Sequence, residues 1–421
     1  MSKHTPPWTR RQVLGSAAAA GLMASSSGLL AQGKAPIKFA ALLDFTKIYT
    51  FASVEYNQGQ KDYIKLVNLE GGVGGHPIDL IVRDHGSEPQ RGIALYNEAR
   101  DAGAVLVDFL STPVSLAMVP RVLKDHIPMI TLLHGRGDSI VGETFPYIFP
   151  SAAIYWSQAA ALIKYIGDSG GGLKGKKIAL VHIDTPFGRE PIVLLKALAE
   201  REGFTLQTFP YPPPGTEQAA TWTTVRRFQP DSVLIWGAGP GQAVSVRQAI
   251  TNGIPVKNIY SVVWMSESDI DTIGAKEAIG LKRFSAVNTS PDLPIIKAIQ
   301  DKVIKPGQGS GDASKVGRTY YNIGVMSMAI PVQAAKLALA KFGAPLTGEK
   351  MKSGLELISG FDAQGLMPPA TINAQDHQGG GWGRISEWDG KAWKPLTDWS
   401  HGAQSTVLAL ARDSASKFKL D

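Results

Sequence analysis

Residues 78–103, IDLIVRDHGSEPQRGIALYNEARDAG, contain one complete strand-and-helix unit. The apolar run at 78–82 has the length and composition of a buried strand. After a short turn we expect a helix with Ser87 as its N-cap, Pro89 in its first turn and Gly103 just past its end. A strand that leads into a helix in this way is the building unit of α/β folds.

The same unit recurs along the chain. Further apolar runs of strand length lie before Pro150 at 37–43, 104–109 and 129–133, and after it at 178–182, 232–236 and 259–263. Stretches of helical period lie at 190–201, 219–228, 242–251 and within 314–342, and the Gly-rich residues 167–175 predict a surface loop. Such alternation predicts two parallel sheets covered by helices, and residues 385–391 predict a final β-hairpin with an Asp-Gly turn.

The N-terminus has the features of an export signal. Arg10 and Arg11 stand directly before a weakly apolar run, residues 13–31, that is rich in Ala, Gly and Ser. This arrangement is typical of a twin-arginine signal peptide, which we expect to span residues 1–31 and to be removed. A transmembrane anchor is the alternative, but the serines and glycines of this run gain little from lipid. We expect no membrane span elsewhere in the chain.

Composition excludes several classes of protein. The sequence holds no Cys, which excludes disulfides, thiolate metal sites, cysteine nucleophiles and a lipid on an N-terminal Cys. We therefore expect a mature protein that diffuses freely in the periplasm. The net charge is +7, and no run of basic residues with interleaved aromatics suggests a nucleic-acid partner. The chain is long enough for two domains with cores of their own.

Several short motifs come in an order that resembles one family, the type I periplasmic binding proteins of the leucine/isoleucine/valine type. The motifs are FAALLD at 39–44, NLEGGVGGHPI at 68–78, LST at 110–112, DTPFG at 184–188, GIP at 253–255 and TIN at 371–373. The resemblance spans essentially the whole chain after the signal. One departure is Asp108, which stands where the family usually has Gly in the loop of the third strand.

The resemblance implies an α/β fold of two Rossmann-like lobes with parallel-rich sheets, joined by three crossovers. Lobe 1 would be residues 36–150 plus 287–360, and lobe 2 would be residues 151–286 plus 361–421. In this family the ligand lies in the cleft between the lobes, which close around it by a hinge motion.

The resemblance also places the ligand contacts in loops that follow strands. Ser111 and Thr112 carry hydroxyls that can donate to a carboxylate, and aromatic side chains offer flat apolar walls. Core packing is the competing explanation for each aromatic residue, and a structural role competes for His134. The predicted ligand-binding residues are Phe45, Tyr49, Ser111, Thr112, Leu133, His134, Phe187, Trp236, Gly239 and Trp264.

Two ligand classes stay open. A hydrophobic amino acid needs an acidic or carbonyl group for its ammonium. The loop after Trp236 contains no Asp or Glu, but Glu267 and Asp184 could supply a carboxylate. The other class is a small apolar or aromatic carboxylate.

Three Gly-rich strings invite an enzymatic interpretation. GDSGG at 167–171 matches the nucleophile region of chymotrypsin-like proteases, but it lies between a helix and a parallel strand and not in the double β-barrel that this chemistry needs. The G-x-G-x-x-G string at 170–175 precedes a strand, although phosphate binding needs it to follow one. The run at 237–241 follows a strand and opens a helix, where it forms either a tight turn or a contact for a ligand carboxylate.

We predict a binding protein and not an enzyme. The sequence lacks a G-x-S-x-G elbow, a P-loop and a properly placed dinucleotide fingerprint, and its histidines lack the close pairing of zinc sites. The predicted function is that of the periplasmic component of an ABC importer. It would be a monomer without cofactor or metal that binds a small molecule and delivers it to a membrane permease. The alternatives are a secreted hydrolase and a ligand-sensing receptor domain of the same fold.

Overall fold

The computed structural model of the chain describes residues 34–420 and Met1. Pro36–Asp421 form one compact unit. The predicted twin-arginine signal, with Arg10 and Arg11, lies outside the described residues apart from Met1.

The first sheet is parallel and is built from the first part of this unit. Its strands lie in the order β2-β1-β3-β4-β5, and every neighbouring pair is parallel. β1 and β3 are apolar and buried along nearly their whole length, as expected for a parallel sheet with both faces covered. The strands are β1 (Ile37–Leu43), β2 (Ile78–Asp84), β3 (Ala104–Asp108), β4 (Met129–Ile130) and β5 (Ile148–Phe149).

Two details of this region correct the sequence prediction. β4 ends at Ile130 and not at residue 133, because the chain turns at Leu133, whose φ of 59° lies in the left-handed region. Ser87 is not the N-cap of the next helix, because it has a φ of 58° and the helix begins one residue later than predicted, after Glu88. The Ser87 hydroxyl instead donates to the carboxylate of Asp44.

The second sheet is mostly parallel and ends in the predicted hairpin. Its strands lie in the order β12-β11-β10-β9-β8-β6-β7. The neighbouring pairs formed among β6, β7, β8, β9 and β10 are parallel. β11 pairs antiparallel with both β10 and β12. The strands are β6 (Lys177–Ile183), β7 (Thr205–Tyr211), β8 (Ser232–Trp236), β9 (Ile259–Ser261), β10 (Lys282–Ser285), β11 (Arg384–Trp388) and β12 (Trp393–Pro395). The fold is therefore the predicted α/β class, with β9 shorter than the apolar run that predicted it.

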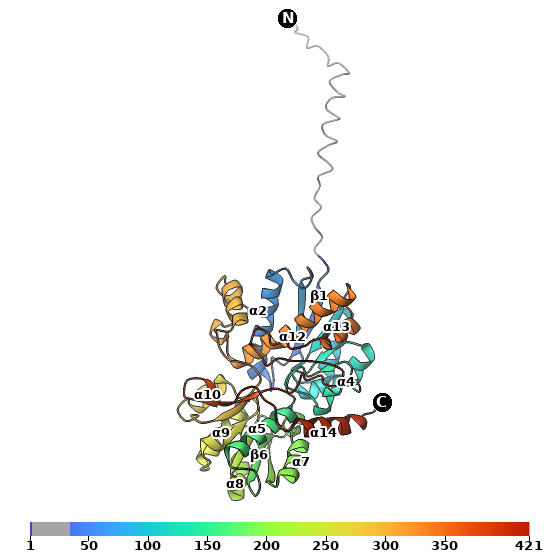
Figure 1. The fold of residues 1–421 in the computed structure, drawn as a ribbon. Helices are drawn as coiled ribbons and strands as arrows, with labels where there is room; N and C mark the ends of the chain where they lie inside the picture. Colours follow the sequence, from blue (N-terminus) through green and yellow to red (C-terminus); the bar gives the residue numbers. More distant parts are fainter. Residues whose placement is uncertain (2–33, 421) are drawn as a thin grey trace. The chain divides into compact units, whose positions relative to one another are not determined.

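Helices connect the strands of each sheet (Figure 1). They are α2 (Thr50–Leu69), α3 (Pro89–Asp101), α4 (Thr112–Asp125), α5 (Tyr155–Ser169), α6 (Pro186–Arg189), α7 (Ile192–Glu202), α8 (Ala219–Phe228), α9 (Pro240–Thr251) and α10 (Glu267–Ile273), with the 3-10 turns η1 (Gly137–Ile140) and η2 (Val256–Asn258). Because α5 continues to Ser169, the predicted Gly-rich loop at 167–175 begins only at Gly170.

The chain passes between the two sheets three times. It leaves the first sheet between β5 and α5, returns between β10 and α11, and leaves again between α13 and β11 (Figure 1). The returning segment holds α11 (Pro294–Ile299), the π-helical turn η3 (Gln300–Ile304), the 3-10 turn η4 (Ala313–Lys315), α12 (Thr319–Phe342) and α13 (Gly348–Leu355). After the hairpin, α14 (Gln404–Ser416) is the last helix.

Two glycines bring α12 into close contact with α2. A Cβ at Gly59 would lie 2.2 Å from the carbonyl oxygen of Tyr321, and a Cβ at Gly324 would lie 1.9 Å from that of Tyr56. Neither position has room for a side chain. The two helices therefore pack backbone against backbone, which fixes the returning segment on the first sheet.

α12 corrects one expectation from the sequence. No segment after the signal was expected to have the length and composition of a membrane span, but α12 has both. Among the described residues it is the one helix long and apolar enough to cross a membrane. Its most apolar window is 72% buried inside the protein. Such burial is typical of a core helix. A core helix is apolar on all sides because other parts of the protein pack around it.

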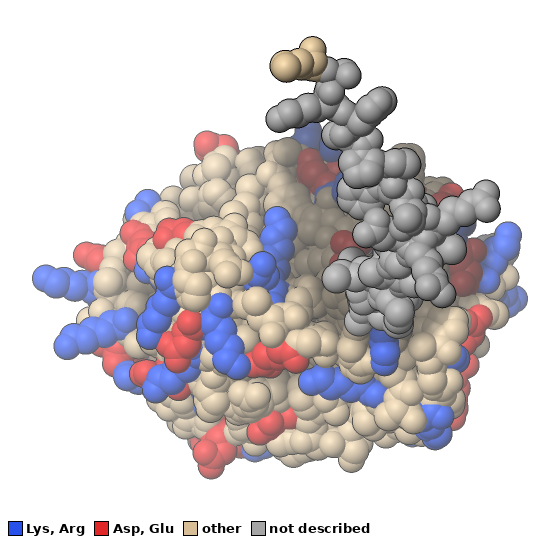
Figure 2. Space-filling model, turned by 90° about the horizontal axis from the view of Figure 1, so that it is seen from above, with Lys and Arg blue, Asp and Glu red and all other residues tan. Residues whose placement is uncertain are grey.

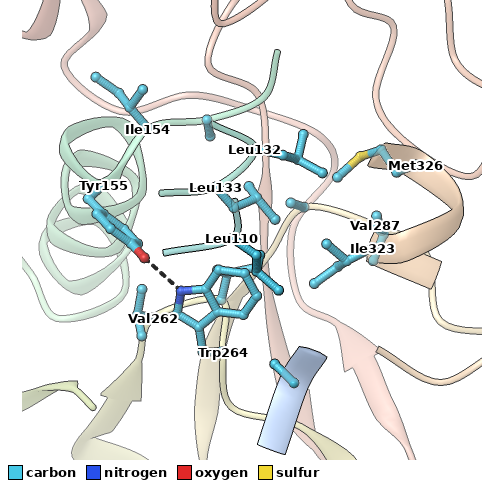
Figure 3. Close-up of a cluster of buried hydrophobic side chains, with 14 of the residues drawn as sticks. Leu110, Leu132, Leu133, Ile154, Tyr155, Val262, Trp264, Val287, Ile323 and Met326 are labelled. Atoms are coloured by element: carbon cyan, nitrogen blue, oxygen red, sulfur yellow. Dashed lines mark hydrogen bonds between the residues drawn. The ribbon is translucent and has the colours of Figure 1, made fainter. Parts of the chain in front are cut away.

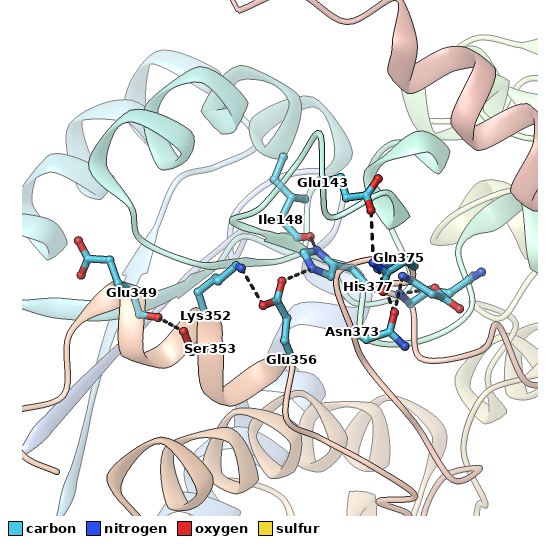
Figure 4. A network of polar contacts seen from close by, with 11 residues as sticks. Glu143, Ile148, Glu349, Lys352, Ser353, Glu356, Asn373, Gln375 and His377 are labelled. Atoms are coloured by element: carbon cyan, nitrogen blue, oxygen red, sulfur yellow. Dashed lines mark hydrogen bonds and ion pairs between the residues drawn. The ribbon is translucent and has the colours of Figure 1, made fainter. Parts of the chain in front are cut away.

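A buried histidine ties the third passage of the chain to the first sheet (Figure 4). The His377 ring stacks on Phe149 with 4.0 Å between the ring centroids. Its Nδ1 donates to the Ile148 carbonyl at 2.8 Å, and its Nε2 lies 3.1 Å from Oε1 of Glu356. Burial raises the pKa of Glu356, but the side chains of His377 and Lys352 outweigh this and hold the pKa below its usual range. Glu356 therefore stays ionised and orients the imidazole.

Charged side chains of both signs share the surface. On the face seen in Figure 2, Lys and Arg are interspersed with Asp and Glu, with wide uncharged areas between them. Over the described residues on this face, no continuous basic stripe forms of the kind that follows a phosphate backbone.

The close contact between α2 and α12 predicts a large effect of one methyl group. Gly59→Ala should lower the free energy of unfolding by about 1–3 kcal/mol, because the new Cβ overlaps the Tyr321 carbonyl. In a helix alanine is otherwise more favourable than glycine by about 1 kcal/mol. A loss of stability in this variant would therefore result from the steric overlap and not from helix propensity. Urea unfolding of the two proteins measures the difference. Val54→Ala in the same helix is the control, since Val54 is 54% exposed and should change stability by no more than about 0.5 kcal/mol. Equal stability of Gly59→Ala and the parent chain would contradict this packing.

Candidate functional site

A cavity lies at the carboxyl ends of strands from both sheets. This is where open α/β sheets bind ligands, because the loops after parallel strands meet there. The residues that line it from the side of the first sheet are Tyr49, Phe51, Ala52, Leu110, Thr112 and His134. Those that line it from the side of the second sheet are Tyr155, Phe187, Ala238 and Trp264.

Aromatic rings form one wall of the cavity. Tyr155, at the start of α5, and Trp264, after β9, point toward one another and lie opposite Leu110 (Figure 3). Phe187 packs against Tyr155 with 5.1 Å between ring centroids. Trp236, fully buried behind them, contacts Tyr155 edge-on at 5.7 Å. These rings offer flat apolar surface to a ligand and support one another.

Two hydroxyl groups supply polar contacts within this wall. The Tyr155 hydroxyl accepts a hydrogen bond from Trp264 Nε1 at 2.8 Å, and it interacts with the Thr112 side chain. Thr112 Oγ1 accepts a hydrogen bond from the backbone N–H of Gly135 at 3.3 Å. Burial raises the pKa of Tyr155 well above its usual value. Both groups are therefore neutral hydroxyls whose protons can be donated to an anionic or carbonyl oxygen.

His134 faces the cavity as a neutral ring. Its Nδ1 lies 3.0 Å from the Leu132 carbonyl, which can only accept, so Nδ1 carries the proton. Its Nε2 then accepts from the Ser115 hydroxyl at 3.0 Å. Burial lowers the pKa of His134 to about 4. With both nitrogens occupied and no charge at neutral pH, His134 contributes shape and rigidity to the cavity and no cation.

The first turn of α4 also lies at the cavity. Ser111 is the N-cap of this helix, and Thr112 is its first residue and lines the cavity. Ser111 Oγ is buried and has no hydrogen-bond partner among the described residues. The first N–H groups of a helix have no partner within the helix, and the helix dipole makes this end positive. An anionic group is therefore favoured at this end of the cavity.

Asp108 shapes the loop that leads into α4. Its carboxylate accepts hydrogen bonds from Tyr56 Oη at 2.6 Å, from Gln60 Nε2 at 2.9 Å and from the Leu110 backbone N–H at 3.2 Å. Burial raises the pKa of Asp108 to about 6, although the hydrogen bonds work in the opposite direction. Leu110 has a φ of 42° and lines the cavity beside Thr112.

Comparison with known proteins gives the family. Residues 36–392 match the family described as periplasmic binding protein. A crystal structure described as an ABC transporter permease from the Pseudomonas fluorescens group is 32% identical, with a TM-score of 0.83 over 90% of this chain and 96% of that chain. The chain belongs to the periplasmic binding protein family.

More distant structures share the fold of this binding protein. One is a branched-chain amino acid ABC transporter from Thermus thermophilus with bound valine, 20% identical with a TM-score of 0.78 over 90% of this chain and 98% of that chain. Another is an ABC transporter solute-binding protein from R. palustris in complex with benzoate, 17% identical with a TM-score of 0.69 over 86% and 95% of the two chains. No curated protein matches the sequence.

The structure of this binding protein brings together half of the residues predicted to bind ligand. Those that line the cavity are Tyr49, Thr112, His134, Phe187 and Trp264. The others lie nearby but do not line it. Ser111 caps α4, Leu133 and Trp236 are fully buried, Gly239 is the N-cap of α9, and Phe45 lines a separate groove on the outer side of α2.

Sequence reasoning missed five residues that line the cavity, namely Phe51, Ala52, Leu110, Tyr155 and Ala238. Tyr155, Phe51 and Ala52 lie in the first turn of a helix, and Leu110 and Ala238 directly precede predicted residues. The general rule that ligands bind at the carboxyl ends of parallel strands applies equally to the first turn of the helix that follows. That rule points to the loops and helix starts that hold all five, but it does not show which of their side chains face the cavity.

The acidic residues considered as partners for an ammonium are occupied elsewhere. Glu267 accepts hydrogen bonds from the backbone N–H and hydroxyl of Thr319, at the start of α12. Asp184 is exposed and pairs with Arg189 at 2.5 Å. Glu190 accepts from Trp156 Nε1 at 2.9 Å, and burial raises its pKa to about 8. Glu190 is therefore mostly protonated at neutral pH.

Within the described part of the chain, the Gly-rich strings and the histidines do not come together as a triad or a metal-ligand cluster. The Ser169 hydroxyl donates to the Tyr165 carbonyl on the exposed side of α5, away from any histidine hydrogen bond. The run at 237–241 makes a tight turn, with a φ of 57° at Gly239. Over residues 34–420, no group of three or more His, Asp or Glu side chains could hold a metal ion.

We predict that His134 stays neutral in the folded protein throughout the physiological pH range, because burial lowers its pKa to about 4. In an NMR titration its ring signals should not shift between about pH 8 and 5. In the unfolded chain the imidazole takes up a proton near pH 6.5. The unfolded state therefore binds more protons between about pH 6.5 and 4, and folding stability falls as pH decreases through this window.

A His134→Gln variant isolates this contribution. Its stability should fall less steeply with decreasing pH than that of the parent chain over the same window. Titration in denaturant provides the reference for an exposed imidazole. A His134 ring that titrates near pH 6.5 in the folded protein would contradict the neutral assignment.

Proposed function

We propose that this periplasmic binding protein is the ligand-binding component of an ABC importer and holds a small apolar or aromatic carboxylate in the cavity between its sheets. The observation that carries the proposal is the composition of the cavity wall. The described residues that line it are aromatic or aliphatic side chains, hydroxyls and a neutral imidazole, with no Asp, Glu, Lys or Arg among them. Such a wall binds a ligand and has no group arranged for acid–base or nucleophilic chemistry.

This wall favours a carboxylate over an amino acid. A zwitterionic amino acid would bring an ammonium into a buried apolar site, and an unpaired buried charge is strongly destabilised. Glu267 and Asp184 are bound to other residues, and Glu190 is mostly protonated. Among the solved relatives, one holds valine and another holds benzoate. A carboxylate without an ammonium, such as benzoate, suits this cavity better than an amino acid such as valine.

The polar head of the ligand would lie at the start of α4. Thr112 and Tyr155 can donate their hydroxyl protons to a carboxylate, and the buried Ser111 hydroxyl belongs to the residue directly before Thr112. The positive end of the helix dipole adds to this attraction. The apolar body would then contact Phe187 and Trp264, which line the second-sheet side of the cavity together with Tyr155.

Ligand binding would close a hinge between two lobes, residues 36–150 plus 287–360 and residues 151–286 plus 361–421. Walls from both sheets give a ligand its full set of contacts only when they approach. The three passages between the sheets are the places where backbone rotation can occur. We further propose that the closed, monomeric protein delivers its ligand to a membrane permease from the periplasm.

Direct binding measurements test the ligand class and its placement. Benzoate should raise the melting temperature of the mature protein, and leucine or valine should not. Thr112→Val and Tyr155→Phe should each weaken benzoate binding roughly ten- to a hundredfold, since a hydrogen bond to a charged group contributes about 1.5 to 3 kcal/mol. Isothermal titration calorimetry measures both constants. Thr223→Val, which removes an exposed hydroxyl on α8, is the control.

Two results would count against this proposal. Stabilisation by leucine or valine without stabilisation by an aromatic acid would show that the ligand is an amino acid. Wild-type affinity in both cavity variants, with the fold intact, would show that the carboxylate lies elsewhere.

Export through the twin-arginine route is a separate prediction. Replacing both Arg10 and Arg11 by Lys should retain the precursor in the cytoplasm, because the route requires the arginine pair. Cell fractionation followed by immunoblotting compares the variant with the parent chain. Equal amounts of both proteins in the periplasm would show that another export route is used.

A further inference from the structure

A second hollow lies on the outer side of α2. Apolar side chains line part of it, namely Phe45, Phe51, Val54 and Val82. Asn57 and Gln58 add amide groups, and an ion pair of 2.7 Å between Lys315 and Glu55 lies at its side. This outer groove is wide, and its apolar part includes Val54, which is 54% exposed.

Phe51 is the residue that the outer groove and the inner cavity share. It contributes to the lining of both, so it lies at the border between the two spaces. The ring packs edge-on against Tyr320 with 5.6 Å between centroids. On the side of the second sheet it meets the turn before α9, where a Cβ at Gly239 would lie only 3.1 Å from Phe51 Cδ1. A single side chain on α2 thus reaches across to the opposite wall.

Gly239 makes this contact possible. It has a φ of 57° and a ψ of −144°, a combination that is open essentially to glycine alone. The backbone can therefore approach the Phe51 ring without a side chain between them.

We propose that Phe51 sets the length of the ligand that this protein binds. The inference rests on the proposed function, since it assumes an apolar carboxylate whose head lies at the start of α4. The ring of Phe51 closes the inner cavity and restricts it to compact acids. If the ring is removed, the cavity opens into the outer groove, whose apolar side can accept an alkyl extension of the same acid.

A pair of acids with the same head measures this effect. Benzoate and 4-pentylbenzoate differ only in an alkyl chain, and the ratio of their dissociation constants cancels the contribution of the carboxylate site. The parent chain should prefer benzoate. Phe51→Ala should shift the ratio at least about tenfold toward 4-pentylbenzoate, because each methylene buried in the outer groove contributes roughly fourfold in affinity. Phe51→Leu, which keeps an apolar side chain in place, should shift it less.

Controls separate ligand length from general damage. Val54→Ala alters the outer groove without touching the inner cavity and should leave the ratio of the parent chain unchanged. Circular dichroism and melting curves verify that each variant is folded. If Phe51→Ala does not fold, the ratio of dissociation constants is measured with Phe51→Leu instead.

The outcomes distinguish this inference from the function on which it rests. If the parent chain binds neither acid, the proposed function fails and the inference fails with it. If the parent chain binds benzoate but the ratio is the same in the Phe51 variants, or if it already binds 4-pentylbenzoate equally well, only the role of Phe51 is refuted.

Discussion

Every strand of the first sheet runs in the same direction, and this constraint decides where a ligand can be bound. Parallel strands end at one edge, so the loops after β1, β3 and β4 lie together without being long. The parallel part of the second sheet gathers the loops after β6, β8 and β9 in the same way. Because the chain passes between the sheets three times, residues at the edges of both sheets line the same cavity. The cavity is thus lined by short segments that are far apart in sequence, and each segment is anchored to a buried strand.

Burial then decides the charge of the site. It lowers the pKa of His134 to about 4 and raises that of Glu190 to about 8, so both groups are mostly neutral at pH 7. Burial also keeps the hydroxyl of Tyr155 protonated. What remains is the fixed polarity of the backbone at the start of α4, together with hydroxyl donors. These groups can balance a negative charge, and nothing comparable in the cavity wall balances a positive one.

The parts of the fold that sequence predicted well are those with local signals. β1 is apolar apart from Lys38 and β8 apart from Ser232, and their predicted limits agree with the structure. β10 could not be found in this way, because it begins with Lys282 and Arg283. These side chains are buried through partners distant in sequence, since Lys282 pairs with Glu387 and Arg283 stacks on Trp393.

The residues of the site also divide into those with a local sequence signal and those without one. Thr112 and His134 follow predicted strands directly, whereas Phe51 and Tyr155 lie in helix starts, where an aromatic residue is not distinguishable by pattern from one that packs in the core. Trp236 ends its strand on the side that packs behind Tyr155, and a sequence pattern does not show which side a terminal residue takes.

The departure at Asp108 has a consequence for binding energy. Where the resembling family usually has a glycine, this chain places a buried carboxyl, and burial raises its pKa. In exchange, Asp108 joins Tyr56 and Gln60 of α2 to the backbone of Leu110. α2 carries Phe51 and Ala52 into the cavity, and Leu110 and Thr112 lie in the connected loop. Three hydrogen bonds to Asp108 thus connect the two segments that form much of the first-sheet side of the cavity. A preformed wall loses little conformational entropy on binding, so the free energy of the contacts remains available to bring the second wall onto the ligand.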